Sequence, residues 1–463
     1  MRSVFATRAF GAILSLTILL TAAGAMAQEQ APEDSSAPAR KAHSLFPKDA
    51  AGLNEMAEQA IAEGNGLRLL QTSILLRKQQ PYELSHMVNM VRAYAMMDKP
   101  NSAYNYMLKM QQQGLNFDFN TLDETAGLRS TEVYAYLNDL MVRAGDPAGE
   151  AEAAFNIDDS YASPAAIAWD PSRERFIVGT SRDGLLISVS DTGKIETLLK
   201  SDPKNGPWAI EDLAVDPERN RLWLTSTSTP EYSAYGNENS GQSGLFAFEL
   251  DSLKPAGRFL VNQEDGPHEL GAVAVDQQGN VYAADRRTAL LYRKQSDSDL
   301  LAPFLADSEL TGFSDMAIAA NGNRIYLADR YKGILAIDPE HEKAVMLEVP
   351  DTLNLGGIEG LFHADHELFI VQSGIEPMRL MALQLDTTGG KVENVRPMAI
   401  ALESFKHPSG GTLRGDSIYY FADAASAAEN VTVLKTALSA GASIVAPDMR
   451  KFEEETLSKA RNN

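Results

Sequence analysis

The stretch "DMAIAANGNRIYLADRYKGILAID", residues 315–338, decides the fold of this 463-residue chain. A first apolar run ends at an Asn-Gly pair, a second run follows, and the polar link "RYKG" leads into a third. Short apolar runs separated by such turns predict neighbouring antiparallel β-strands. A weaker fourth run, "AVMLEV" at residues 344–349, completes a four-stranded unit.

Similar units recur along the chain, spaced 43 to 60 residues apart when the central residue of each first run is compared: Ala168, Ala214, Ala274, Ala317, Phe362 and Thr412. A period of roughly 40 to 50 residues with several strands per unit is typical of β-propeller blades. The six copies predict a six-bladed propeller over residues 150–445, with sandwiches and solenoids as the alternatives. Because the sixth copy is one strand short, we expect "EAAFNID", residues 152–158, to pair with it and close the ring.

Residues 45–149 have a different, helical pattern, with apolar residues recurring at intervals of three and four. The segment "NMVRAYAMMDKPNSAYNYMLKMQQQG" resembles a tetratricopeptide repeat, in which Ala93, Tyr94, Ala103 and Met107 would let two helices pack closely. Such modules commonly offer a concave surface to peptides, so a peptide or protein partner is one interpretation. A cap that only packs on its neighbour is the other. The fold class is therefore mainly β, with a helical module before the propeller.

The N-terminal residues predict export, and both ends of the chain are expected to lie outside the folded domains. Residues 1–27 combine Arg2 and Arg8, an apolar run and a final "AMA", the layout of a secretory signal peptide. Residues 28–44 are rich in Pro, Ala and acids and are expected to form a flexible tether, and residues 446–463 a helical tail. With no cysteine for disulfides, a periplasmic location fits best.

The net charge excludes one class of partner. It is -22 for the whole chain, and it becomes -24 once a signal segment with two arginines and no acids is removed. A field of this sign repels phosphate backbones, so nucleic acid is not an expected partner. No segment of the mature chain is apolar for long enough to span a membrane.

The repeats, with "ADR" or "SRDG" after the second strand, resemble NHL-type repeats and the senescence marker protein/gluconolactonase family of six-bladed propellers. That resemblance implies a divalent metal, usually calcium, held by carboxylate and amide side chains at the axial opening, and an acid that assists lactone hydrolysis. Glu359 is an acceptable match for the fifth-blade ligand. Ala162 and Ser163 stand where the first blade should offer Glu, Ser314 stands in place of Asn, and the third-blade pair has no counterpart.

Polar residues at two recurrent places of each unit are predicted to meet on one face of the ring. Residues before or at the start of the first strands and residues in the link after the second strands both lie around the axial opening. The candidate ligand-binding residues are Arg182, Glu211, His268, Glu269, Arg286, Arg330, Arg379 and His407, and the candidate metal ligands are Asp212, Asp315 and Glu359. The insertion "TSTPEYSAYGNENSGQSG", residues 227–244, is expected to overhang the same face.

Several of these features also have structural interpretations. The aspartates that precede Arg286 and Arg330 can cap the turns that follow them, and the acids can form solvated ion pairs with the arginines. "HADHE", residues 363–367, is expected to be an exposed turn on the opposite face, and no nucleophile elbow, P-loop or zinc-protease motif is present. The sequence therefore favours a non-catalytic propeller that binds a small polar molecule or a protein on its axial face. A calcium-dependent lactonase or esterase is the alternative.

Overall fold

The computed structural model describes residues 47–443, except 162, 263, 265, 308 and 425–429. The predicted signal peptide and the predicted C-terminal tail therefore lie outside the described residues, as does all of the predicted tether. Among the described residues, no helix is both long and apolar enough to cross a membrane.

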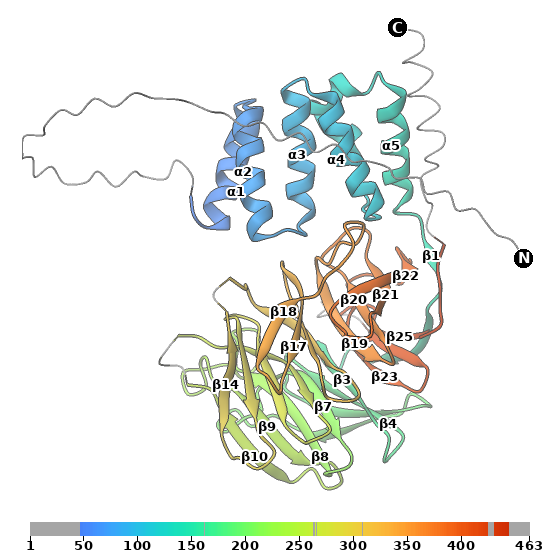
Figure 1. Cartoon of the computed structure of the whole chain (residues 1–463). Helices are drawn as coiled ribbons and strands as arrows, with labels where there is room; N and C mark the ends of the chain where they lie inside the picture. Colours follow the sequence, from blue (N-terminus) through green and yellow to red (C-terminus); the bar gives the residue numbers. More distant parts are fainter. Residues whose placement is uncertain are drawn as a thin grey trace, which may run out of the picture. The chain divides into compact units, whose positions relative to one another are not determined.

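Five α-helices and two 3-10 helices come first: α1 (Ala50–Ala62), α2 (Gly66–Gln79), α3 (Leu84–Met96), α4 (Pro100–Gln112), η1 (Phe119–Thr121), η2 (Asp123–Leu128) and α5 (Glu132–Arg143). Figure 1 shows the α-helices side by side, and successive helices contact each other. Local signals set their starts, because the side chains of Asp49, Asn65 and Thr131 accept hydrogen bonds from backbone N–H groups in the first turn. Of the four residues that the tetratricopeptide resemblance places between two helices, Ala93, Ala103 and Met107 are fully buried and Tyr94 is half-buried.

The rest of the described chain forms six antiparallel sheets, which confirms the predicted six-bladed propeller. The first three blades are β3 (Pro164–Asp170), β4 (Arg175–Thr180), β5 (Leu186–Ser190) and β6 (Ile195–Leu199); β7 (Ala209–Asp216), β8 (Arg221–Thr227), β9 (Ser243–Glu249) and β10 (Pro255–Leu260); and β11 (Leu270–Val275), β12 (Val281–Asp285), β13 (Leu290–Lys294) and β14 (Leu301–Ala306).

The next two blades are β15 (Phe313–Ile318), β16 (Ile325–Asp329), β17 (Gly333–Asp338) and β18 (Lys343–Met346); and β19 (Ile358–Ala364), β20 (Glu367–Gln372), β21 (Arg379–Leu385) and β22 (Val392–Ile400), to which the short β1 (Ala148–Gly149) adds a fifth strand. The sequence did not predict β1. The first strands of the six blades contact one another in the closed cycle β3, β7, β11, β15, β19 and β23, so they surround the axis of the ring.

The sixth blade closes the ring as the sequence predicted. Its strands β23 (Ser409–Arg414), β24 (Ser417–Phe421) and β25 (Val431–Ala437) come from the end of the propeller, and β2 (Glu152–Ile157) pairs with β25 from the beginning. The two ends of the domain thus combine to give the sixth blade four strands.

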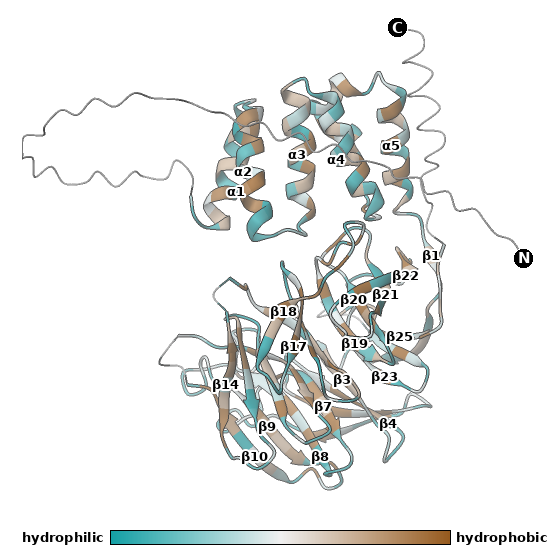
Figure 2. Cartoon of the chain, in the orientation of Figure 1, coloured by the Kyte–Doolittle hydropathy of each residue, from teal (hydrophilic) through white to brown (hydrophobic). Residues whose placement is uncertain are grey.

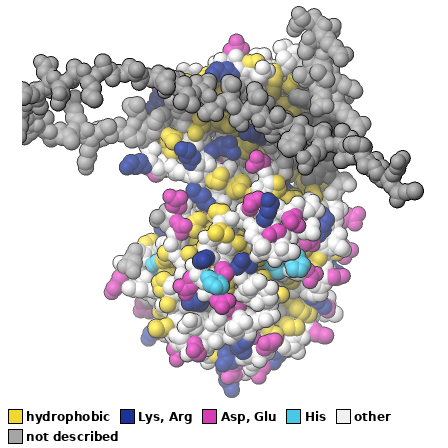
Figure 3. Space-filling view, viewed as in Figure 1, with side chains coloured by type: hydrophobic (Ala, Val, Ile, Leu, Met, Phe, Trp, Pro, Cys, Tyr) yellow, Lys and Arg dark blue, Asp and Glu magenta, His cyan; other side chains and the backbone are white. Residues whose placement is uncertain are grey.

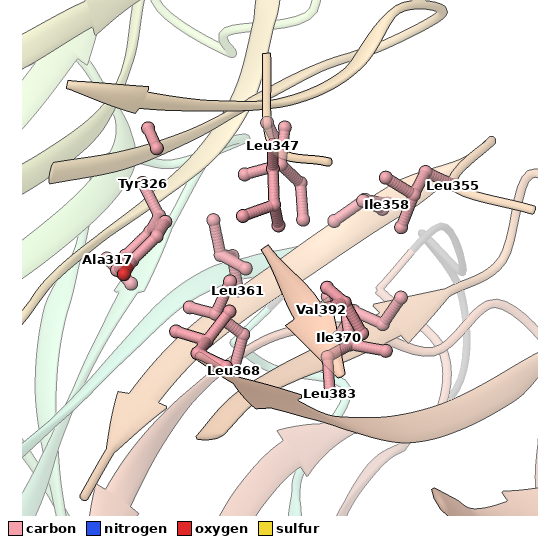
Figure 4. Packing of buried hydrophobic residues seen from close by; sticks show 14 of the residues in the cluster. Ala317, Tyr326, Leu347, Leu355, Ile358, Leu361, Leu368, Ile370, Leu383 and Val392 are labelled. Atoms are coloured by element: carbon pink, nitrogen blue, oxygen red, sulfur yellow. The ribbon is translucent and has the colours of Figure 1, made fainter. Parts of the chain in front are cut away.

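Packing between neighbouring blades supplies the core. Figure 2 shows that hydrophobic residues dominate the strands, while the connecting turns are largely hydrophilic. Between the fourth and fifth blades, Ala317 and Tyr326 face Leu361, Leu368 and Ile370 in one buried cluster (Figure 4). On the surface shown in Figure 3, acidic and basic side chains are intermixed with small apolar patches.

The helices and the fifth blade are joined by hydrogen bonds from residues far apart in the sequence. The backbone N–H of Asn116 donates to the carbonyl of Glu376 at 2.9 Å, and Gln113 donates through Nε2 to the carbonyl of Asp351 at 3.0 Å. Arg379 donates to the Gln113 carbonyl at 2.9 Å from the blade side. Ile375 is buried in the helical core cluster, so apolar packing accompanies these bonds.

Candidate functional site

All six innermost strands carry a register irregularity near their N-terminal ends, where the pairing with the second strand skips a residue. The skipped residues are Ala165, Glu211, Gly271 with Ala272, Ser314, Glu359, and Gly410 with Gly411. A β-bulge of this kind re-aims a side chain out of the regular alternation of a strand. The repetition therefore creates a ring of re-aimed positions, one from each blade.

These positions, apart from Gly271, line a cavity of about 440 Å³ on the axis of the propeller. Every innermost strand contributes to its wall, through Ala165, Glu211, Ala272, Ser314, Glu359 and Gly410 among others. We call this cavity, with the residues that line it, the axial channel. Four of its blades offer small or neutral residues at the bulge, so the chemistry comes from the second and fifth blades and from the residues beside them.

Five ionisable side chains predicted as site residues do meet in the axial channel: Glu211, Asp212, Arg286, Asp315 and Glu359. Four are acids and one is basic. Because blades two and five are three places apart in a ring of six, Glu211 and Glu359 approach the axis from opposite sides.

Glu211 forms an ion pair with Arg286, whose Nη1 donates to Oε2 at 2.9 Å. Burial raises the pKa of Glu211 above its ordinary value, while the Arg286 charge opposes that rise. The pKa of Arg286 is itself raised: burial would lower it, but the surrounding acids, with Glu211 first, outweigh that effect. The pair therefore places two opposite charges at the channel wall: Glu211 on the second blade and Arg286 on the third.

Asp212 and Asp315 share one arrangement. Asp212 accepts the N–H of Leu213 at 2.8 Å and, from the next blade, the N–H of Val273 at 2.7 Å. Asp315 likewise accepts the N–H of its neighbour Met316 at 2.7 Å and, from the next blade, that of Leu361 at 2.6 Å. Each carboxylate thus joins the first strands of two blades.

Burial has the largest effect on the pKa of both aspartates. It raises the pKa of Asp212 to about 6, against the opposing effect of its two backbone hydrogen bonds. It also raises the pKa of Asp315 well above its ordinary value, and the nearby charges of Asp212 and Glu359 raise it further. Ionisation of these two acids is therefore disfavoured in the axial channel, and a cation that enters it would favour their charged forms.

The remaining candidates lie outside the wall of the axial channel. Glu269 is half-buried and near enough to raise the pKa of Arg286, whereas Arg182, Arg330 and His407 are exposed. Arg379 is only 2% exposed and donates to Gln372 Oε1 at 2.8 Å and to the carbonyls of Gln113 and Asn354. It stabilises the junction between the helices and the fifth blade.

The predicted turn caps are confirmed. Asp285 accepts the N–H groups of Arg287 and Thr288 at 2.8 and 3.0 Å, and its other oxygen lies 2.7 Å from His268 Nδ1. Asp329 accepts the N–H groups of Tyr331 and Lys332 in the same way. His268 is buried beside the link that carries Arg286, so it supports the geometry of that link.

The insertion in the second blade lies between β8 and β9 and packs through two buried residues. Tyr232 hydrogen-bonds Ser201, and Asn239 accepts from Ser228 and donates to the carbonyl of Pro203 at 3.0 Å. The charge of Glu231 contributes to the raised pKa of Glu211. The insertion therefore reaches the neighbourhood of the axial channel.

His363 is a channel residue that the sequence interpretation missed. It was predicted to be an exposed turn residue, but it is half-buried in β19 and lines both the axial channel and a separate cavity of about 310 Å³. Its ring stacks on Tyr326 with centroids 5.6 Å apart, and burial lowers its pKa. The signal available was the length of the apolar run, since His363 and Ala364 follow directly after "IEGLF" within β19.

Calcium does not fit the side chains of the axial channel. The oxygens of Asp212 and Asp315 already accept backbone N–H groups, whereas calcium requires six to eight oxygen ligands. Across the described part of the chain, no three Asp, Glu, His or Cys residues are grouped so that they could hold a metal ion. Ala162, at one missing ligand position, lies outside the described residues.

Comparisons with known proteins find distant similarity to solved structures. No protein-family model matches the sequence, and no curated protein matches it. Solved structures with a similar fold include a putative gluconolactonase (12% identity, TM-score 0.44, 64% of this chain and 93% of that one) and a luciferin-regenerating enzyme (12%, 0.44, 61% and 93%). A streptogramin B lyase is similar at 11% identity and a TM-score of 0.43, over 62% of this chain and 98% of its own.

Proposed function

We propose that the axial channel binds a small polar molecule that carries a positive charge. The observation that supports this proposal most directly is the charge of the wall, where four acids face one arginine around about 440 Å³. A volume of this size accommodates a small organic molecule. Binding without chemistry is the simpler function, because the calcium-dependent alternative lacks a set of metal ligands among the described residues.

Glu359 is the acid best placed to recognise the ligand. Glu211 is paired with Arg286, and Asp212 and Asp315 are engaged with backbone N–H groups. Glu359 accepts no hydrogen bond from any described residue. Its charge raises the pKa of both Arg286 and Asp315, so it lies near them in the axial channel. An ammonium group that reaches Glu359 would gain a charge-assisted hydrogen bond without displacing a protein donor.

The test is calorimetric titration of the protein with 1,4-diaminobutane at pH 8 and low ionic strength. Glu359→Gln keeps the shape of the side chain and removes its charge, so affinity should fall by at least about tenfold, as expected for a lost hydrogen bond to a charged group. The matched control is Glu340→Gln, an exposed acid that does not line the axial channel. Absence of binding, or an equal loss in the control, would refute the proposal.

The predicted export and the predicted partner of the helices remain part of the proposal. Periplasmic location is inferred from residues 1–27 and from the absence of cysteine, and N-terminal sequencing of exported protein should find Gln28 first. A polypeptide partner would bind the helices and not the axial channel. Competition between such a partner and 1,4-diaminobutane would contradict that division.

A further inference from the structure

Arg286 gives the axial channel a second kind of recognition, and this inference rests on the proposed function. It is the only basic side chain among the described residues that line the channel, apart from the imidazole of His363. Its side chain is 32% exposed, and it uses only Nη1 in its ion pair with Glu211. Neither Nε nor Nη2 donates a hydrogen bond to a described residue, so several N–H groups of the guanidinium are available to a ligand.

Gly271 determines where the guanidinium lies. A methyl group at this bulge position would come 2.6 Å from Nε and 3.3 Å from both Cζ and Nη2 of Arg286. The guanidinium therefore lies directly against the backbone of the innermost strand of its own blade. The backbone N–H of Arg286 donates to the Glu269 carbonyl at 2.9 Å, and Asp285 caps the same link. These contacts hold the base of the side chain in a defined place.

The charges of the channel are consequently arranged in two groups. Arg286 and Glu211 lie at the second and third blades, while the unpaired Glu359 approaches from the fifth blade across the axis. A planar guanidinium with free N–H groups suits a carboxylate, which it can bind through two parallel hydrogen bonds. We propose that the ligand of the axial channel is a zwitterion, with its ammonium group on Glu359 and its carboxylate on Arg286.

Two probes of equal length test this inference. 4-Aminobutanoate and 1,4-diaminobutane share an ammonium end and differ only in whether the other end is a carboxylate or a second ammonium. Calorimetry should show that Arg286→Met weakens the binding of 4-aminobutanoate by about tenfold or more. The same change should leave 1,4-diaminobutane binding equal or stronger, because a cation has been removed from an acidic site. Loss of structure could not produce these opposite effects.

Two further variants make the test specific. Arg287→Met changes the adjacent, exposed arginine and should alter neither affinity. Gly271→Ala keeps every charge but displaces the guanidinium, so it should reproduce part of the selective loss of 4-aminobutanoate binding. Equal weakening of both probes by Arg286→Met would overturn the inference, as would wild-type protein that binds 1,4-diaminobutane but not 4-aminobutanoate. The second result would leave the proposed function standing, whereas wild-type protein that does not bind 1,4-diaminobutane would refute the proposed function itself.

Discussion

Replacing Asp212 with asparagine should make the stability of this protein less dependent on pH. Asp212 is the acid whose carboxylate joins the second and third blades by accepting the N–H groups of Leu213 and Val273. Burial raises its pKa from 3.8 to about 6 in the folded chain. The unfolded chain exposes the same group to water, so its pKa returns to the ordinary value.

The magnitude follows from that difference. Below pH 3.8 the carboxyl is protonated in both states and has no effect on the free energy of unfolding. Between pH 3.8 and about 6 the folded state binds more protons than the unfolded state, so stability falls as the pH rises. Above that range the cost levels off at about 3 kcal/mol, since each pKa unit corresponds to about 1.4 kcal/mol.

An asparagine side chain removes the charge and retains one acceptor oxygen, but its amide nitrogen cannot accept the second N–H. We therefore expect Asp212→Asn to be less stable than the wild type at pH 4, by about 1 to 3 kcal/mol for the unsatisfied N–H. At pH 8 the removed cost offsets that loss, so the two proteins should be similar in stability. Urea unfolding at both pH values measures this, with the exposed Asp365→Asn as control. A stability difference between variant and wild type that is the same at both pH values would refute the reasoning.

Three further outcomes are expected. The affinity for 1,4-diaminobutane should rise from pH 5 to pH 7, because the raised pKa of Asp212 keeps this carboxyl partly protonated at the lower pH. Calorimetric titration in buffers of different ionisation enthalpy should detect the proton that is released on binding. Phe155→Ala should cost about 3 to 4 kcal/mol in urea unfolding, since this largely buried ring belongs to the strand that closes the ring; an effect below about 1 kcal/mol would show that β2 is dispensable. Arg379→Met leaves the acceptors of Gln372, Gln113 and Asn354 without their donor and should cost about 3 kcal/mol, whereas Arg182→Met, at an exposed site, should cost less than about 0.5 kcal/mol.

The propeller was predictable because each blade repeats the same local chemistry. In the fourth blade, the turn around Gly322 and the link before Gly333 have positive φ angles of 71° and 100°, which glycine adopts without strain. Apolar alternation then places Ile325 and Leu327 in one cluster and Tyr326 and Ala328 in another, so both faces of the strand are buried. These signals are local in the sequence. Pairing of β2 with β25 was also predictable, because a missing strand in one repeat leaves only one place for a spare strand.

The position of Arg379 shows what sequence patterns cannot supply. Its place at the start of a third strand suggested the axial face, as for the other link arginines. It is covered instead by Gln113, a residue 266 positions away at the end of α4. Nothing local to either residue indicates that contact, and burial without a carboxylate partner lowers the pKa of Arg379 to about 10. Contacts between the helical segment and the propeller thus decide which charges remain available to a ligand.

The sequence placed the acids of the innermost strands near the axis, but it did not show which of them bind backbone N–H groups. The bulges explain this difference. Glu211 and Asp212 are adjacent in the sequence, and regular alternation would send one of them away from the axis. Because the pairing skips Glu211, both side chains reach the axial channel, and the same irregularity admits Ser314 and Asp315 together. The second residue of each pair is then committed to a backbone N–H of the next blade. The second and fourth blades therefore keep an aspartate for the fold, while the skipped position varies over the six blades among glutamate, serine, alanine and glycine. It is this variation from blade to blade that places the glutamates of the axial channel on the second and fifth blades.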